Sequence, residues 1–177
     1  MATLHVATSS AVPRHVHRKI RAMLDEAFDG DFTDDDWDHA TGGLHVWLTV
    51  SRAVISHASL VERTLVCGDH HLRVGYVEAV ATAAAFRHRG HGLRVMRHIG
   101  AQILDRFPLG TLSTGAYAFY AALGWERWRG PTFVDGPDGR ERTARDDGDI
   151  LILRTARTPS LDLDQAIVCD WRAGDVW

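Results

Sequence analysis

The stretch from Gly75 to Leu93 constrains the fold more than any other part of the sequence, because a strand, a Gly-rich basic loop and a helix follow one another there. Residues 76–81 form a near-continuous apolar run, as expected of a strand that is covered on both faces. Glu78 interrupts this run. A carboxylate in a buried strand is costly unless it has a partner or a task, so Glu78 is a candidate functional residue.

The loop that follows the strand reads Arg87-His88-Arg89-Gly90-His91-Gly92, and a helical pattern begins at Leu93. Backbone N–H groups at the start of a helix lie at the positive end of the helix dipole and suit a phosphate or pyrophosphate. The alternative interpretation is a surface turn with scattered basic residues.

Size and composition predict one mixed domain over residues 1–177. The net charge of -3 gives no indication of nucleic-acid binding. Cys67 and Cys169 have neither disulfide nor metal-site spacing, and we expect both to be reduced core residues of a cytoplasmic protein. The first ten residues do not resemble a signal peptide, and no apolar run approaches the roughly 20 residues of a membrane span.

The hydrophobic pattern predicts an alternation typical of an α/β (α+β mixed) domain. We expect helices from Pro13 to Gly30, over 34–40, from Leu93 to Pro108 and over 116–123. We expect strands over 4–8, 44–50, 53–67, 70–82, 109–112, 125–129, 150–153 and 167–169, and a turn over 135–139.

Residues 29–38 contain six aspartates and no Lys or Arg. Thr33 and Asp36 have the spacing of a capping box, which explains two or three of these acids but not six. A solvated acidic turn and a binding surface for cations both remain open at this point.

A second motif occurs in Ala116–Trp125, which has the form A-x-x-F-Y-x-x-x-G-aromatic. Together with the Arg-x-x-Gly-x-Gly loop about thirty residues before it, this motif resembles the GNAT N-acetyltransferase superfamily. The resemblance implies a central mixed, mostly antiparallel sheet that is splayed between strands 4 and 5 and flanked by helices. It implies acetyl-CoA as cosubstrate, with the pantetheine on Val80, Ala81 and Thr82, the diphosphate on Arg87, His88, Arg89, Gly90, His91 and Gly92, and Tyr120 facing the sulfur.

A narrower resemblance covers nearly the whole chain. The segments 30–33 with Trp37, 42–45, 75–78 and 169–177 are similar to the aminoglycoside 2'-N-acetyltransferases. This likeness implies a homodimer that binds an aminoglycoside through Asp31, Asp36, Glu78, Ala79, Ser113, Asp146 or Asp147, Asp175 and Trp177 with its terminal carboxylate. The segment between Ser113 and Tyr120 is about two residues shorter than the family pattern, and spacing alone does not decide between Asp146 and Asp147.

The chemistry of acetyl transfer accounts for two of these residues. An ammonium has no lone pair, so a proton must leave before the amine attacks, and we expect Glu78 to act as general base through a water. A strand amide near Val80 would stabilise the oxyanion, and Tyr120 would protonate the thiolate. The alternatives are a structural pairing of Glu78 with Arg73 and a core role for Tyr120 against Trp125.

The remaining hypotheses concern metals and other functions. The histidine pairs 15/17, 70/71 and 88/91 lack neighbouring ligands, so we expect surface histidines and no metal. Two competing functions are a GNAT enzyme for another polycationic amine, such as a polyamine or peptide, and a non-catalytic sensor of cationic sugars.

Overall fold

The computed structural model describes all 177 residues, and their contacts form two compact units. Unit 1 comprises Met1–Val61 and Val77–Ile99, and unit 2 comprises Glu62–Tyr76 and Gly100–Trp177. Three elements run from one unit into the other, namely β3 (Ala53–Cys67), β4 (His70–Thr82) and α3 (His91–Arg106). That the two units act as the single domain expected from the sequence stays a prediction.

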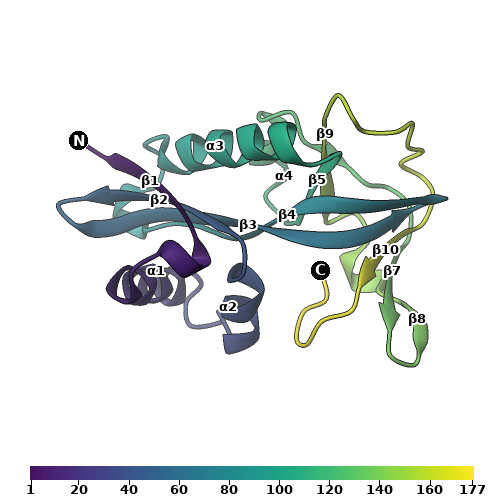
Figure 1. The fold of residues 1–177 in the computed structure, drawn as a ribbon, viewed down its shortest axis with the longest axis horizontal. Coiled ribbons are helices and arrows are strands. Elements are labelled where there is room, and N and C mark those ends of the chain that lie inside the picture. The colour runs from purple at the N-terminus through teal and green to yellow at the C-terminus, as the bar shows by residue number, and fades with distance from the viewer. The chain divides into compact units, whose positions relative to one another are not determined.

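Unit 1 is built on antiparallel strands. β1 (Thr3–Thr8) pairs with β2 (Leu44–Val50), and β2 pairs with β3, with a register shift after Leu48. Helices α1 (Arg14–Ala27) and α2 (Asp34–Ala40) lie on one side of these strands and α3 lies on the other (Figure 1). The apolar residues of α1 recur every three or four positions, so one face of the helix is buried. That face meets the strands in a core of Val12, Ile20, Met23, Leu24, Phe32, Trp47 and Val54.

The capping box predicted for α2 is present. The backbone N–H of Asp36 donates to Thr33 Oγ1 at 3.1 Å, and the N–H of Thr33 donates back to Asp36 Oδ2 at 2.8 Å. Asp34, Asp35 and Asp36 occupy the first turn, where negative charge is favoured by the helix dipole. A short helix of seven residues is therefore stabilised at the end where the acids lie.

Unit 2 contains both parallel and antiparallel pairs. β4 runs parallel to β5 (Leu109–Ser113) at Gly75–Gly110 and Tyr76–Thr111, and β9 (Ile150–Arg154) pairs antiparallel with β5 and β6 (Glu126–Arg127). β10 (Ile167–Asp170) is antiparallel to β3 and parallel to β7 (Thr132–Gly136). The mixed, mostly antiparallel sheet flanked by helices that the GNAT resemblance implied is confirmed.

The structure corrects several boundaries. The turn predicted over 135–139 is present at residues 137–138, but the strands on either side of it were not predicted. They are β7 and β8 (Gly139–Arg142), which form an antiparallel hairpin. The strand expected over 125–129 is the two-residue β6, and the helix expected over 116–123 is the shorter α4 (Tyr117–Ala121). Cys67 and Cys169 are free and buried, as predicted, and no helix is long and apolar enough to cross a membrane.

Candidate active site

Glu78 lies beside a kink in β4. The next residue, Ala79, has a φ of 50°, a left-handed conformation that costs an alanine about 1–2 kcal/mol. Ser59 Oγ donates to the carbonyl of Glu78 at 3.3 Å, and the ring of His57 binds the carbonyl of Ala79 at 2.9 Å. Side chains of β3 therefore hold the backbone at the position where the sequence places the candidate base.

The edge residues Val80, Ala81 and Thr82 follow the kink and are half-buried. Ser56 Oγ donates to the carbonyl of Ala81 at 3.0 Å and lies 2.9 Å from Thr82 Oγ1. These contacts fix the segment that the family resemblance assigns to the pantetheine.

The loop before α3 has the features of an anion site. Residues 87–90 are exposed, and His88 and Gly90 have φ values of 60° and 78°. The first α3 hydrogen bond runs from the Arg94 N–H to the Gly90 carbonyl, so the preceding amides of residues 91–93 are orphan donors of the helix start. The geometry fits a diphosphate, because amides and arginines lie together at the positive end of a 16-residue helix.

Arg87 has a structural task in the same loop. Its guanidinium donates to the carbonyl of Thr82 at 3.1 Å and to the carbonyl of Ala27 at 3.2 Å. The arginine thus ties the end of β4 to the end of α1, and Arg89, which stacks over Phe86, is a second exposed cation of the loop.

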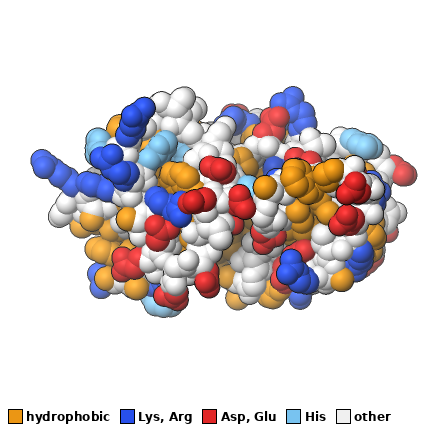
Figure 2. All heavy atoms as spheres, turned by 90° about the horizontal axis from the view of Figure 1, so that it is seen from below, with side chains coloured by type: hydrophobic (Ala, Val, Ile, Leu, Met, Phe, Trp, Pro, Cys, Tyr) orange, Lys and Arg blue, Asp and Glu red, His pale blue; other side chains and the backbone are white.

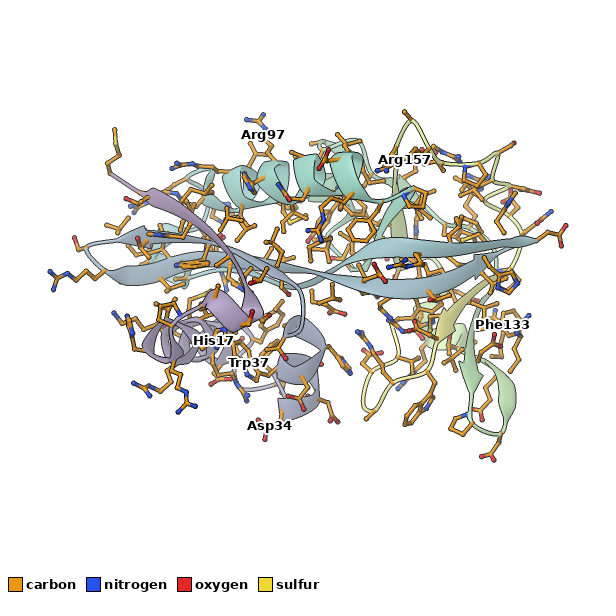
Figure 3. All side chains as sticks on the ribbon, viewed as in Figure 1. His17, Asp34, Trp37, Arg97, Phe133 and Arg157 are labelled. Carbon is orange, nitrogen blue, oxygen red and sulfur yellow. The ribbon has the colours of Figure 1, made fainter.

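The acidic segment of unit 1 forms part of the surface seen in Figure 2, where acidic side chains gather over α2. Asp31 is exposed, whereas Asp36 Oδ2 already accepts two hydrogen bonds from Thr33. Figure 3 shows Asp34 pointing away from the strands, and it pairs with Arg21 at 2.9 Å. The six acids therefore divide between capping, ion pairing and exposed positions.

Two predicted substrate residues of unit 2 line one cavity of about 360 Å³. Asp146 and Asp175 belong to the two segments that line it, 142–146 and 174–176, and Arg142 and Arg145 are also on the lining. Burial and the nearby charge of Asp175 raise the pKa of the Asp146 carboxyl above its ordinary value. Two carboxylates that disfavour each other's charge are a suitable site for an ammonium group.

Asp147 has a different environment from Asp146. Its carboxylate binds the Arg142 guanidinium through two hydrogen bonds and accepts from the N–H and hydroxyl of Thr132, both at 3.0 Å. The hydrogen bond from Arg142 is the main reason why the pKa of Asp147 falls to about 2. Asp147 is thus a structural anchor of the β7–β8 region.

The C-terminal segment is held by buried contacts. The guanidinium of Arg63, 5% exposed, donates to the carbonyl of Val176 at 2.7 Å and to the carbonyl of Asp170 at 2.6 Å. The indole N–H of Trp177 donates to Thr143 Oγ1 at 2.8 Å, and Thr143 lines the cavity that contains Asp146. Trp177 therefore packs beside the cavity that contains Asp175.

Tyr120 and Ser113 also belong to unit 2. Ser113 is exposed at the end of β5, and Tyr120 is buried on α4 with its ring 5.9 Å from that of Trp125. Burial raises the pKa of the Tyr120 phenol, which keeps the hydroxyl protonated. Arg73, the alternative partner for Glu78, makes a bidentate ion pair with Glu62.

The sequence is similar to that of a known acetyltransferase over nearly its full length. No family model matches the sequence, but 99% of the chain aligns with an aminoglycoside 2'-N-acetyltransferase of Mycolicibacterium fortuitum, at 39% identity and over 92% of that protein. The chain belongs to the aminoglycoside 2'-N-acetyltransferase family.

Solved structures confirm the GNAT fold of this acetyltransferase family member. A GNAT N-acetyltransferase (YhbS) from Escherichia coli in complex with CoA superposes with a TM-score of 0.67 at 14% identity, over 95% of this chain and 89% of that one. The ribosomal-protein-S18-alanine N-acetyltransferase of E. coli gives 0.61 at 15% identity, over 89% and 96%. The chain spans about a third of a longer GCN5-related N-acetyltransferase from Kribbella flavida (TM-score 0.59, 19% identity, 73% of this chain and 34% of that one).

Sequence reasoning missed the buried polar groups that support this family member's site. His45 and His57 are both fully buried, and Arg63 holds the C-terminal segment. The prediction of surface histidines is wrong for His17, which is half-buried and packs 5.7 Å from Trp37, beside which it lies in Figure 3. No cluster of three or more His, Cys, Asp or Glu side chains could hold a metal ion.

Proposed function

We propose that this chain transfers the acetyl group of acetyl-CoA to the 2'-amino group of an aminoglycoside. The observation that carries the proposal is the 39% identity with an aminoglycoside 2'-N-acetyltransferase over nearly the full length of both chains. The Asp146 and Asp175 carboxylates in the cavity of unit 2 and the kinked β4 of unit 1 supply the chemistry that this reaction needs. That residues of both units bind the same aminoglycoside is inferred from the family membership.

Recognition of a cationic sugar is assigned to carboxylates. Asp146 and Asp175 face one cavity, and a bound ammonium would relieve the unfavourable proximity of their charges. We assign the drug contact to Asp146 rather than Asp147, because the Asp147 carboxylate is occupied by Arg142 and Thr132. Asp31, Asp36, Glu78, Ala79, Ser113 and Trp177 complete the proposed substrate set.

Proton transfer is assigned to Glu78 and Tyr120. Glu78 accepts a proton from the substrate ammonium through a water, and this step exposes the lone pair that attacks the thioester carbonyl. The amide near Val80 donates to the developing oxyanion. The protonated, buried hydroxyl of Tyr120 then donates its proton to the departing thiolate.

No cysteine takes part in this scheme. Burial raises the pKa of the Cys67 thiol to about 12 and that of the Cys169 thiol to about 11. Because a thiolate and not a thiol is the nucleophile, direct attack by the amine is the proposed route.

Acetyl-CoA is assigned to unit 1. Val80, Ala81 and Thr82 would hold the pantetheine, and the loop of Arg87, His88, Arg89, Gly90, His91 and Gly92 would hold the diphosphate. The fit rests on the exposed amides and cations at the start of α3. The family resemblance further suggests a cytoplasmic homodimer, and light scattering of the purified protein would measure its mass against 19.7 kDa for one chain.

One assay tests the proposal. The protein is mixed with acetyl-CoA and either tobramycin, which carries a 2' amine, or amikacin, which carries a 2' hydroxyl, and free thiol is followed. We expect thiol release with tobramycin and none with amikacin. Release with spermidine but not with tobramycin would instead identify an acetyltransferase for another polycationic amine, and binding of both ligands without thiol release would identify a sensor.

A further inference from the structure

Three buried polar side chains of β3 bind the backbone of β4 around its kink. Ser56, His57 and Ser59 are all fully buried, and they bind the carbonyls of Ala81, Ala79 and Glu78 respectively. A strand interior this rich in polar groups is costly unless every group is paired. The β3 side chains thus bind the β4 backbone around the kink, and His57 reaches Ala79, the residue with the left-handed φ of 50°.

A continuous hydrogen-bond chain lies behind His57. His57 Nε2 lies 2.9 Å from His45 Nδ1, and His45 Nε2 lies 2.8 Å from Ser9 Oγ. Ser9 in turn accepts from the N–H of Gly42 at 2.9 Å. This series of hydrogen bonds therefore runs without interruption from the kink in β4 to Gly42, just before β2.

The acceptor at the inner end and the neutral state of both rings together set the donor directions. A carbonyl oxygen only accepts, so His57 Nδ1 carries a proton, and in a neutral imidazole His57 Nε2 is then bare. His45 donates from Nδ1 to His57 Nε2, which leaves His45 Nε2 as an acceptor. The Ser9 hydroxyl, which also lies 3.2 Å from the Gly43 carbonyl, donates to His45 Nε2 at 2.8 Å, the shorter of its two contacts. Both imidazoles are neutral in this arrangement, and burial, which lowers the pKa of His45 to about 4 and that of His57 to about 3, agrees with it.

We propose that His57, supported by His45 and Ser9, is a positioning residue for acetyl transfer, whose N–H holds the Ala79 carbonyl and so fixes the kink that orients Glu78 and the Val80–Thr82 edge. This inference rests on the proposed function. Its physical basis is that a left-handed alanine persists only where surrounding contacts outweigh the strain. A hydrogen bond aligned with its neighbours in one direction is also strengthened by them.

The test compares two substitutions at His57 with a matched control. His57→Leu removes the donor, whereas His57→Asn retains an N–H at the position of Nδ1. The control is His5→Leu. His5 also lies in the strands of unit 1 and forms a hydrogen bond of 2.9 Å with the Thr49 hydroxyl, but it makes no hydrogen bond to β4. Each variant is assayed for tobramycin-dependent turnover and for acetyl-CoA affinity, and its backbone amide spectrum is recorded.

We expect His57→Leu to lower kcat by about tenfold or more, because even a small displacement of the reacting groups slows the chemical step. His57→Asn should restore most of the loss, and His5→Leu should have little effect. The ¹⁵N signal of Val80, which shares a peptide unit with the Ala79 carbonyl, should move in His57→Leu and return in His57→Asn. Turnover and a Val80 signal that are unchanged in His57→Leu would overturn the proposal.

The wild-type protein offers a second test that does not depend on the folding of any variant. Long-range proton–nitrogen spectra report which imidazole nitrogen is protonated. Protonated Nδ1 and bare Nε2 on both His45 and His57 are expected, and a protonated Nε2 on His57 would contradict the chain. These spectra need no drug, so a wild type that is inactive toward tobramycin would refute the proposed function while the spectra still decide whether His57 Nδ1 donates to the Ala79 carbonyl.

Discussion

Asp146 and Asp147 are neighbours in sequence, yet their surroundings assign them opposite tasks. Asp147 is neutralised by Arg142, whereas Asp146 lines a cavity together with Asp175, whose charge acts on it. We expect Asp146→Asn to raise the Kd for tobramycin by about tenfold, the effect of losing one partly desolvated charge pair. Calorimetric titration measures this directly.

Asp147→Asn is the matched control for that substitution. The Asp147 side chain is 38% exposed, so solvent screens its ion pair and we expect a loss of about 1 kcal/mol of folding free energy. Drug affinity should stay within a factor of about two, well below the tenfold effect of a lost charge pair. A larger loss of affinity in Asp147→Asn than in Asp146→Asn would reverse our assignment.

Glu78 is the proposed general base of the reaction. Replacing it with Gln keeps the shape of the side chain but removes the base, and we expect kcat to fall by about 100-fold. The effect should be greatest at lower pH, where more of the substrate is ammonium. The pH–rate profiles of wild type and Glu78→Gln test this, and profiles of the same shape would exclude the base role.

Tyr120 and Tyr117 lie on the same short helix, which allows a controlled test of the proposed acid. The Tyr120 hydroxyl is buried, whereas Tyr117 donates to Asp149 near the surface. We expect Tyr120→Phe to slow transfer by about 100-fold with little change in drug affinity. Tyr117→Phe should leave turnover nearly unchanged, and equal effects of the two substitutions would argue against a catalytic hydroxyl.

At the scale of elements, the buried histidines of β2 and β3 make folding sensitive to acid. Both have pKa values in the folded state, about 4 for His45 and about 3 for His57, below the 6.5 of an unfolded chain. Their neutral forms therefore stabilise the fold fully above pH 6.5, and this contribution is lost as the pH falls toward those values. At pH 5 the loss is about 2 kcal/mol for each histidine.

Urea unfolding at pH 7 and pH 5 measures this loss. We expect the stability of the wild type to fall more steeply between these values than that of His57→Asn, which cannot take up the proton. His70→Ala, a change at an exposed histidine, should match the wild type. Equal pH dependence in wild type and His57→Asn would show that the buried imidazole does not control acid stability.

The strength of the local signals explains which elements could be predicted. Leu44–Val50 and Ala53–Cys67 are rich in apolar residues on either side of the Ser51-Arg52 turn, and the structure begins and ends both strands at these residues. β8 was missed because all four of its residues are exposed and carry no alternating pattern. His45 and His57 escaped notice because a fully covered strand shows no alternation that separates a buried histidine from an exposed one.

The candidate site was likewise predictable only where its features depend on local sequence. The Gly-rich loop before α3 and the capping box at Thr33 depend on neighbours in sequence, so both could be predicted before the fold was known, whereas the diphosphate site at Arg87–Gly92 stays a prediction. The choice between Asp146 and Asp147 depends on contacts with Thr132 and Asp175, which are distant in sequence. No spacing rule reports such contacts, and only the three-dimensional arrangement separates the two carboxylates.

At the scale of the whole molecule, we propose that unit 1 binds the thioester and unit 2 supplies carboxylates for a cationic sugar. A crystal structure with CoA and tobramycin bound would test both assignments together. We expect the pantetheine along Val80–Thr82, the diphosphate at the start of α3, the 2' amine nearest Glu78, and drug ammonium groups on Asp146 and Asp175. A pantetheine bound elsewhere, or a drug that contacts neither aspartate, would contradict the account.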